Sequence, residues 1–451
     1  MSRKFTLLAY LLSAVAPVLL TTQQPASAAD EQFTATAAIT LPNGQKIRSF
    51  DISFVDPVLG LYVLADRTNK AVDVVDTHNN TTSQLGAGLF VGFTGNNDTS
   101  GPDGVLIVDH RDVWAGDGNS TFKVIDLFTN TVTATVSTGG VNRVDEMCLD
   151  PRNHLVLMAN NAESPRPFAT LVSTHQPVSA ASIVKKITFD GTNNTPIATN
   201  GAEQCQWSPR TGKFYIAIPE VNGPGDNTAA GGVAVINSHG QVETTFIIDH
   251  EKCAGPQGMA IGPDHQILLG CNAPSGKKTA ADTVGNGKFR TVVIDERNGH
   301  IIRAFDNESG ADEVWFNPGN GHYFLARSAA DGPTQLLGVI DAEALKEDAS
   351  VFTSNKGTIP GTNPPLAVAN AHSVAADPVT NKTFVPIGFG SGTVCSSAGG
   401  NDALGCIAVF TAPKDRDDCV AEGAPVIEVK DDGDSRFHRG ECGPDHDHDH
   451  R

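Results

Sequence analysis

One strand–turn–strand unit recurs along the chain, and this recurrence limits the possible folds more than any other sequence feature. Six copies place a proline in the turn, and a seventh, "PDGVLIVDHRDVWAGD", has Asp109-His110 there instead. Each copy continues into a third strand with a similar end, such as Val74-Val75-Asp76 or Val293-Ile294-Asp295. Two landmarks that recur in the same order indicate a true repeat. The turn prolines are Pro57, Pro151, Pro209, Pro263, Pro318 and Pro378.

A fourth strand follows in most copies, and the unit heads lie roughly 42 to 60 residues apart, which is typical of a propeller blade. The 45 glycines and 26 prolines also favour short strands and turns over helices. We therefore predict an all-β fold, a single seven-bladed β-propeller over residues 33–413. The strand at 33–41 precedes the first copy and would complete the seventh blade, which closes the ring. The segment "APVIEVK", residues 424–430, competes for that place.

Units with a second strand like "YVLAD" and a third strand ending in "VID" resemble those of the YVTN or lactonase-like seven-bladed propellers. The resemblance covers about residues 33–413. The second strand of the first copy, Tyr62 to Asp66, departs from the motif that names the family. The resemblance implies the propeller fold. Its members include lactone hydrolases, binding modules and proteins of unknown role, so it leaves the function open.

The N-terminus has the pattern of a cleaved secretory signal peptide at residues 1–28. Arg3 and Lys4 precede an apolar run over residues 7–20, and Ala26-Ser27-Ala28 forms a small-residue cleavage site. We therefore expect a periplasmic or secreted monomer without a membrane span. The formal net charge of −19 repels phosphate backbones, so nucleic acid is not an expected partner. Residues 414–451 form an acidic tail that contains cysteine and histidine.

Eight cysteines are an even number, and in an exported chain we expect them to be paired. Position along the repeats suggests which residues meet, although sequence alone does not fix connectivity. The pairs we expect are Cys148 with Cys205, Cys253 with Cys271, Cys395 with Cys406, and Cys419 with Cys442.

A polar residue lies six positions before each turn proline, where the innermost strand of a blade begins. These six residues and Asp103, at the equivalent position of the seventh copy, would converge on one mouth of the central channel, and we call all seven the ring: Asp51, Asp103, Asp145, Glu203, Gln257, Asp312 and His372. Like charges raise one another's pKa, so five carboxylates need compensation. A divalent cation supplies it, with calcium favoured by the oxygen ligands and magnesium an alternative. Direct coordination by His372 would favour zinc, manganese or iron. Otherwise the carboxylates cap backbone N–H groups and bind no ion.

The loops between second and third strands are long and lie on the same side as the ring, so this face is the expected working face. Four residues near it are candidate ligand contacts, namely Arg143, Asn160, Asn272 and Arg327. Glu146 and Glu313 directly follow ring aspartates. Because side chains alternate along a strand, we expect both to point toward blade packing or the loop, in structural roles.

Two functions compete. In the first, a metal-centred hydrolase cleaves a lactone or similar ester, with His372, Asp145 or Asp312 accepting a proton from metal-bound water. In the second, a non-catalytic module binds a small-molecule ligand or a protein partner through the ring and loops. A redox subunit is the weakest alternative, because the sequence contains no cofactor motif.

Overall fold

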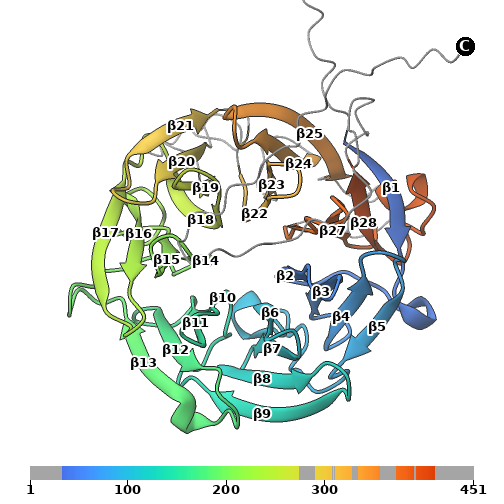
Figure 1. Ribbon diagram of the computed structural model, residues 1–451, viewed down its shortest axis with the longest axis horizontal. Helices are drawn as coiled ribbons and strands as arrows, with labels where there is room; N and C mark the ends of the chain where they lie inside the picture. The colour runs from blue at the N-terminus through green and yellow to red at the C-terminus, as the bar shows by residue number, and fades with distance from the viewer. Residues whose placement is uncertain are drawn as a thin grey trace, which may run out of the picture.

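The computed structural model is a ring of seven four-stranded antiparallel sheets around a central channel (Figure 1). It describes residues 33–273, 290–306, 308, 310–327, 334–355, 372–390 and 393–411. The predicted signal peptide and the tail, with Cys419, Cys442 and residues 424–430, lie outside these ranges. The predicted all-β, seven-bladed propeller is confirmed.

Each blade runs from an inner strand at the channel to an outer strand at the rim. Blade 1 consists of β2 (Ser53–Asp56), β3 (Leu61–Asp66), β4 (Ala71–Asp76) and β5 (Thr82–Leu85). Blade 2 consists of β6 (Val105–Val108), β7 (Asp112–Asp117), β8 (Thr121–Asp126) and β9 (Thr131–Ser137). Blade 3 consists of β10 (Met147–Asp150), β11 (Leu155–Asn160), β12 (Phe168–Ser173) and β13 (Ile183–Thr188). Blade 4 consists of β14 (Cys205–Ser208), β15 (Lys213–Ile218), β16 (Gly231–Ile236) and β17 (Val242–Ile248).

The remaining blades follow the same order. Blade 5 consists of β18 (Ala254–Ile261), β19 (Gln266–Ala273), β20 (Thr291–Asp295) and β21 (Ile301–Phe305). Blade 6 consists of β22 (Glu313–Asn317), β23 (His322–Arg327), β24 (Thr334–Asp341) and β25 (Lys346–Asn355). Blade 7 consists of β26 (Ala375–Ala376), β27 (Thr383–Ile387), β28 (Cys406–Thr411) and β1 (Thr34–Ile39). Short helical turns lie in the loops: η1 (Pro42–Gly44), η2 (Asn97–Thr99), η3 (Ala180–Ser182) and α1 (Val394–Ser397).

The N-terminal strand closes the ring, as predicted. β1 pairs antiparallel with β28, with Ala38 opposite Ala408 and Ile39 opposite Ile407 (Figure 1). The outer strand of blade 7 therefore comes from the start of the chain, and its other three strands come from the end. This closure joins the two ends of the propeller and removes the free edges of an open ring.

The repeated Asp-Pro turn works through its aspartate. In blade 1, Asp56 Oδ1 accepts hydrogen bonds from the backbone N–H groups of Val58 (2.9 Å) and Leu59 (3.1 Å). This side-chain turn fixes the reversal between the first two strands. Asp150 and Asp377 accept equivalent bonds in blades 3 and 7.

The core lies between the blades. Buried apolar side chains of the described residues form clusters at each of the seven blade junctions, for example Leu64 with Phe384 and Ile407 between blades 1 and 7. Because each sheet packs both faces against neighbours, its two middle strands are apolar nearly throughout, as in β11 and β23.

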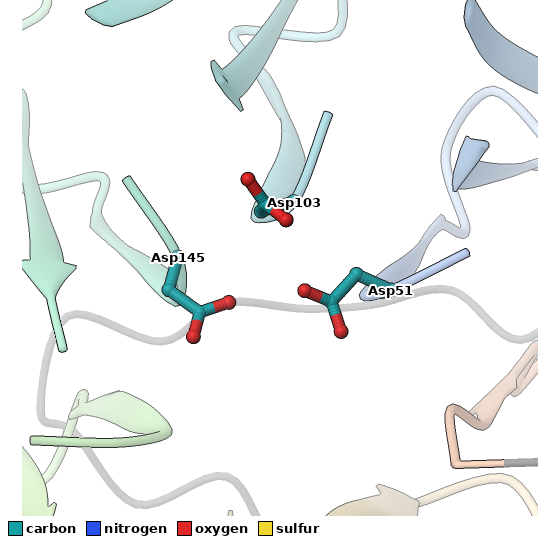
Figure 2. A group of neighbouring side chains, drawn as sticks. All are labelled: Asp51, Asp103 and Asp145. Carbon is teal, nitrogen blue, oxygen red and sulfur yellow. The ribbon is translucent and has the colours of Figure 1, made fainter. Parts of the chain in front are cut away.

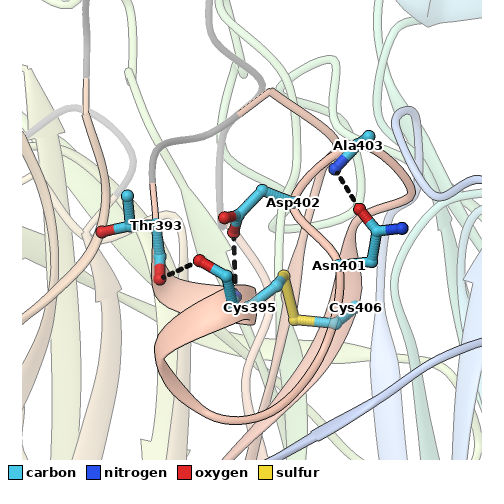
Figure 3. The surroundings of a disulfide bond; sticks show 7 residues. Thr393, Cys395, Asn401, Asp402, Ala403 and Cys406 are labelled. Atoms are coloured by element: carbon cyan, nitrogen blue, oxygen red, sulfur yellow. Dashed lines mark hydrogen bonds between the residues drawn. A yellow bond between two sulfur atoms is a disulfide. The ribbon is translucent and has the colours of Figure 1, made fainter.

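Three of the four predicted disulfides are present. Cys148–Cys205 joins β10 to β14 and so links blades 3 and 4, with a Cα separation of 5.7 Å. Cys253–Cys271 lies within blade 5. Cys395–Cys406 links α1 to β28 (Figure 3). Beside this bond, Asp402 Oδ1 accepts a hydrogen bond from the Ser396 N–H (3.1 Å). The fourth pair lies outside the described residues.

Candidate functional site

Three ring aspartates come together at the channel mouth. Asp51, Asp103 and Asp145 precede the inner strands of blades 1, 2 and 3, and each offers a carboxylate oxygen within 4.8 Å of the others. Figure 2 shows their carboxylates turned toward one another. A glycine helps to bring two of these blades close. At Gly104, an added Cβ would lie 1.6 Å from the Asp145 carbonyl oxygen, so only glycine allows this approach.

Two arginines form ion pairs with these aspartates. Arg67 follows β3, and its guanidinium bonds both Asp51 and Asp103, with Nε 2.8 Å from Asp103 Oδ1. Arg143 lies 2.7 Å from Asp145 Oδ2 and 3.3 Å from Asp51 Oδ2. All five side chains are at least nine-tenths buried. The cluster is therefore a network of buried ion pairs, in which removal of either partner leaves an uncompensated charge.

The three aspartates of this network differ in pKa. Burial acts to raise the pKa of Asp51, but Arg67, Arg143 and then His372 outweigh it and hold that pKa at about 2. Burial raises the pKa of Asp103 well above its ordinary value, although Arg67 opposes the shift. Burial also raises the pKa of Asp145, against Arg143. Asp51, which contacts both arginines, is thus the carboxylate that stays ionised most readily.

The other ring residues form a less buried part of the mouth, which we call the acceptor half: Glu203, Gln257 and Asp312 of blades 4, 5 and 6. In the described part of the chain, no lysine or arginine lies within salt-bridge distance of Glu203 or Asp312. The polar neighbour of Glu203 is Asn161, whose Nδ2 lies 3.3 Å from Glu203 Oε2. Gln257 Oε1 is buried without a hydrogen-bond partner.

His372 lies between the two parts of the mouth. Its Nε2 is 2.9 Å from the Phe50 carbonyl oxygen and 3.3 Å from Asp51 Oδ1. A carbonyl only accepts, so Nε2 carries a proton and donates it. Nδ1 lies 3.7 Å from Asp312 Oδ2. The ring imidazole is thus oriented by backbone, with one nitrogen directed toward the acceptor half.

Both carboxylates of the acceptor half have raised pKa values. Burial, and next the charge of Asp312, raise the pKa of Glu203 to about 7. Burial likewise raises the pKa of Asp312, and His372 opposes the shift. Glu203 therefore changes charge near neutral pH.

Glu146 and Glu313 do not point toward blade packing or the loop, and that expectation was wrong. A hydrogen bond joins their side chains, although they belong to blades 3 and 6, so they meet in the channel. Both side chains are buried. The alternation rule failed because Glu146 precedes β10 and Glu313 is the first residue of β22.

The four candidate ligand contacts are placed differently. Arg143 lies in the network above. Asn160 is fully buried and donates to Ser120 Oγ (3.0 Å) and to the Arg143 carbonyl (3.1 Å), so it supports the loop that carries Arg143. Arg327 is buried, with Nη1 3.3 Å from Glu308 Oε2. Asn272 lies in β19, and its side chain is outside the described part.

Sequence analysis missed Arg67, although "ADRT" places it directly after a second strand at the working face. It also missed two glutamates that shape the loops there. Glu163 Oε1 accepts from the N–H groups of Val141 (2.6 Å) and Asn142 (2.7 Å). Glu220 accepts from Thr199 Oγ1 (2.6 Å) and from the Thr228 N–H (3.1 Å).

Comparisons with known proteins identify the fold. No protein-family model and no curated protein matches the chain. A chain of the crystal structure of the mitotic checkpoint complex is similar at 12% identity and a TM-score of 0.56, covering 90% of this chain and 99% of that one. The WD40 β-propeller domain of Doa1 is similar at 12% identity and a TM-score of 0.53, covering 85% and 98%. Within the described residues, no helix is long and apolar enough to span a membrane. The chain is a seven-bladed β-propeller, and these comparisons do not support the narrower YVTN or lactonase-like family.

Proposed function

We propose that this chain is a binding propeller whose channel mouth takes a cationic group, an ammonium or guanidinium, from a small molecule or a protein partner. One observation carries the proposal. The acceptor half presents Glu203, Asp312 and the unpartnered Gln257 Oε1, all of them acceptors, with no arginine or lysine paired to either carboxylate in the described chain. Hydrogen-bond donors with positive charge complement such a surface.

The two sides of the mouth differ in how their carboxylates are paired, and this difference supports the assignment. On one side, Arg67 and Arg143 form ion pairs with all three aspartates. On the other side, Glu203 has a pKa raised to about 7, first by burial and then by the charge of Asp312. A bound cation would relieve this repulsion. Binding should therefore strengthen as the pH rises through 7 and Glu203 loses its proton.

The similar structures favour binding over catalysis. One is a chain of the mitotic checkpoint complex, and the other is a WD40 propeller domain. Their identity to this chain supports only the fold, so partner binding is our proposal here. We further propose that the protein works in an oxidising, exported setting, since its three disulfides would persist there.

Calorimetric titration with spermidine and with a lysine hexapeptide tests the mouth. Hydrogen bonds to charged groups contribute about 1.5–3 kcal/mol, so Glu203→Gln should weaken binding roughly tenfold or more. Glu251→Gln is the matched control, because Glu251 is an exposed glutamate on the loop after β17, which connects blade 4 to blade 5. Equal affinity of the Glu203→Gln and wild-type proteins would contradict the proposal.

A second candidate is the divalent cation at Asp51, Asp103 and Asp145, favoured by the 4.8 Å grouping of their oxygens. Calcium suits these ligands, with magnesium as the alternative, and zinc, manganese or iron would bring in His372. A lactonase-like activity would rest on that ion. Metal analysis of the tail-deleted protein tests whether an ion binds. A hydrolysis assay with a panel of lactones and aryl esters then tests whether the protein is a hydrolase. An ion that binds without any hydrolysis would leave the binding propeller as the better description.

A further inference from the structure

The central channel contains an apolar cavity below the Glu146–Glu313 pair. Its volume is about 410 Å³, within the range of roughly 300–1,000 Å³ typical of small-molecule sites. Inner strands of blades 1 to 6 line it. Most of its wall is aliphatic or aromatic, including Phe54, Leu149, Trp207, Trp315 and Phe316.

Blade 7 explains why there is space here. Its inner strand is only Ala375–Ala376, and no described residue of this blade lines the cavity. Phe54 of blade 1 and Trp315 of blade 6 meet edge to face in front of it, with centroids 5.7 Å apart. Both remain only half-buried although they lie on inner strands. Apolar rings that keep exposed area around a cavity gain free energy when a ligand covers them.

Polar groups at the inner end of the cavity satisfy one another. Glu146 bonds Glu313, and such a bond between two carboxyl groups needs a shared proton. Gln204 lies beside Glu146 in the cavity wall, and its Nε2 donates to the Val314 carbonyl (3.4 Å). Its Oε1 accepts from the Met259 N–H. Within the part of the chain that the structure describes, no arginine or lysine lines the cavity.

The other end reaches the face opposite the ring. Pro151 and Pro209 line the cavity, and both belong to turns between first and second strands. Beside them, the Arg152 guanidinium lies over the Trp207 ring at 5.4 Å. A ligand would therefore enter from this face.

We propose that this cavity is a second binding site, for a neutral aromatic or apolar small molecule. The proposal rests on its volume, its aromatic wall and its polar end, where the polar groups hydrogen-bond one another. It is distinct from the cation site at the mouth, because no ring residue, all seven of them described, lines the cavity. Aromatic ligands fit best, since ring edges and faces of Phe54, Trp207, Trp315 and Phe316 are available to them.

The test uses N-phenyl-1-naphthylamine, a neutral aromatic dye whose emission rises in apolar surroundings, with the full chain. We expect saturable binding of about one dye per chain, since such sites are few per protein. The double variant Leu149→Phe/Ile261→Phe adds volume to the wall and should raise the dye Kd by at least about tenfold. Val184→Phe/Ile302→Phe, the same gain on exposed outer strands, should leave the Kd unchanged. Glu203→Gln should also leave it unchanged, whereas it weakens cation binding.

The proposal would be overturned if the dye showed no saturable rise in emission with the wild-type protein. Equal Kd values for the filled variant, Leu149→Phe/Ile261→Phe, and the control variant, Val184→Phe/Ile302→Phe, would also overturn it. If the filled variant does not fold, energy transfer decides. Trp207 and Trp315 are two of the three tryptophans, and the third, Trp114, is fully buried in blade 2. Trp315→Phe should then reduce transfer from tryptophan to the dye, and undiminished transfer would place the dye elsewhere.

Discussion

Glu146 and Glu313 share a proton across the channel, although 167 positions and two intervening blades separate them around the ring. Burial, first, raises the pKa of Glu146 to about 8. Burial and the charge of Glu146 raise the pKa of Glu313 well above its ordinary value. The bond itself raises the pKa of Glu313 and lowers that of Glu146, so Glu313 is the donor and Glu146 the acceptor. Two carboxyl groups that interact this closely form one unit of the channel wall.

The first prediction concerns pH. The pKa of an unfolded glutamate is about 4.3, so between about pH 4 and 8 the folded pair binds more protons than the unfolded chain. Stability must then fall as the pH rises through this window, by up to about 1.4 kcal/mol per pH unit for each proton. The Glu146→Gln/Glu313→Gln variant, which mimics two protonated groups, should lose this slope and be more stable than wild type at pH 8.

Urea unfolding at pH 5 and pH 8 measures the difference, with Glu251→Gln as the exposed control. Four ring carboxylates with raised pKa values contribute the same sign, so the comparison is between proteins at each pH; they are Asp103, Asp145, Glu203 and Asp312. A variant with the wild-type slope would mean that the pair is already ionised in the folded protein.

The second prediction concerns Arg67, which bonds both Asp51 and Asp103. Removing one partner of a buried ion pair costs about 3–5 kcal/mol, so Arg67→Ala should be strongly destabilised. Adding calcium tests whether the three aspartates can bind a cation or serve only as ion-pair partners of the arginines. If their oxygens can hold a cation, calcium should raise the Tm of Arg67→Ala more than that of wild type, because it replaces the lost guanidinium.

Differential scanning fluorimetry with and without calcium gives this answer, with magnesium and zinc for comparison. Arg111→Ala is the control, since Arg111 is an exposed arginine paired with Asp126. Absence of any calcium effect on Arg67→Ala would remove the cation candidate at these three aspartates.

The third prediction ranks two disulfides by loop length. Cys148–Cys205 closes a separation of 57 residues, and Cys395–Cys406 closes 11. In the chain-entropy description, the longer loop stabilises by about 1.5 kcal/mol more. Cys148→Ser/Cys205→Ser should therefore lower the free energy of unfolding more than Cys395→Ser/Cys406→Ser, as measured in denaturant. The reverse order would show that strain or local packing outweighs the entropy of the unfolded chain.

Sequence could predict the blades because their signals are local. Asp56 forms the turn in blade 1 by accepting a hydrogen bond from the N–H of Val58, two positions later. This contact is local and does not depend on the rest of the chain. The ring followed from the same register, and the pairing of Cys148 with Cys205 followed from neighbouring positions in adjacent blades. These features depend on spacing within or between consecutive units, which a repeat preserves.

The charge network could not be predicted in this way. Arg67 reaches Asp103 across a blade junction, and its direction depends on the loop after β3, where no repeat rule applies. The Glu146–Glu313 contact depends on the width of the channel, which is a property of the closed ring. Strand alternation does not extend to residues at or before the first strand position, so it gave the wrong direction for both.

The last prediction concerns closure of the ring by β1. Both β1 and β9 are outer strands with a bulge, at Thr36 and Thr133, but only β1 joins the two ends of the propeller. Two adjacent prolines after the bulge must remove at least one ladder hydrogen bond in either strand. Ala37→Pro/Ala38→Pro should therefore lower the Tm more than the matched Ala134→Pro/Thr135→Pro, because it also opens blade 7 and exposes the edge of β28. Light scattering during heating should show earlier aggregation for the β1 variant alone. Equal losses in the two variants would mean that β1 stabilises the fold only as any outer strand does, and that blades 6, 7 and 1 hold together through their apolar junctions without it.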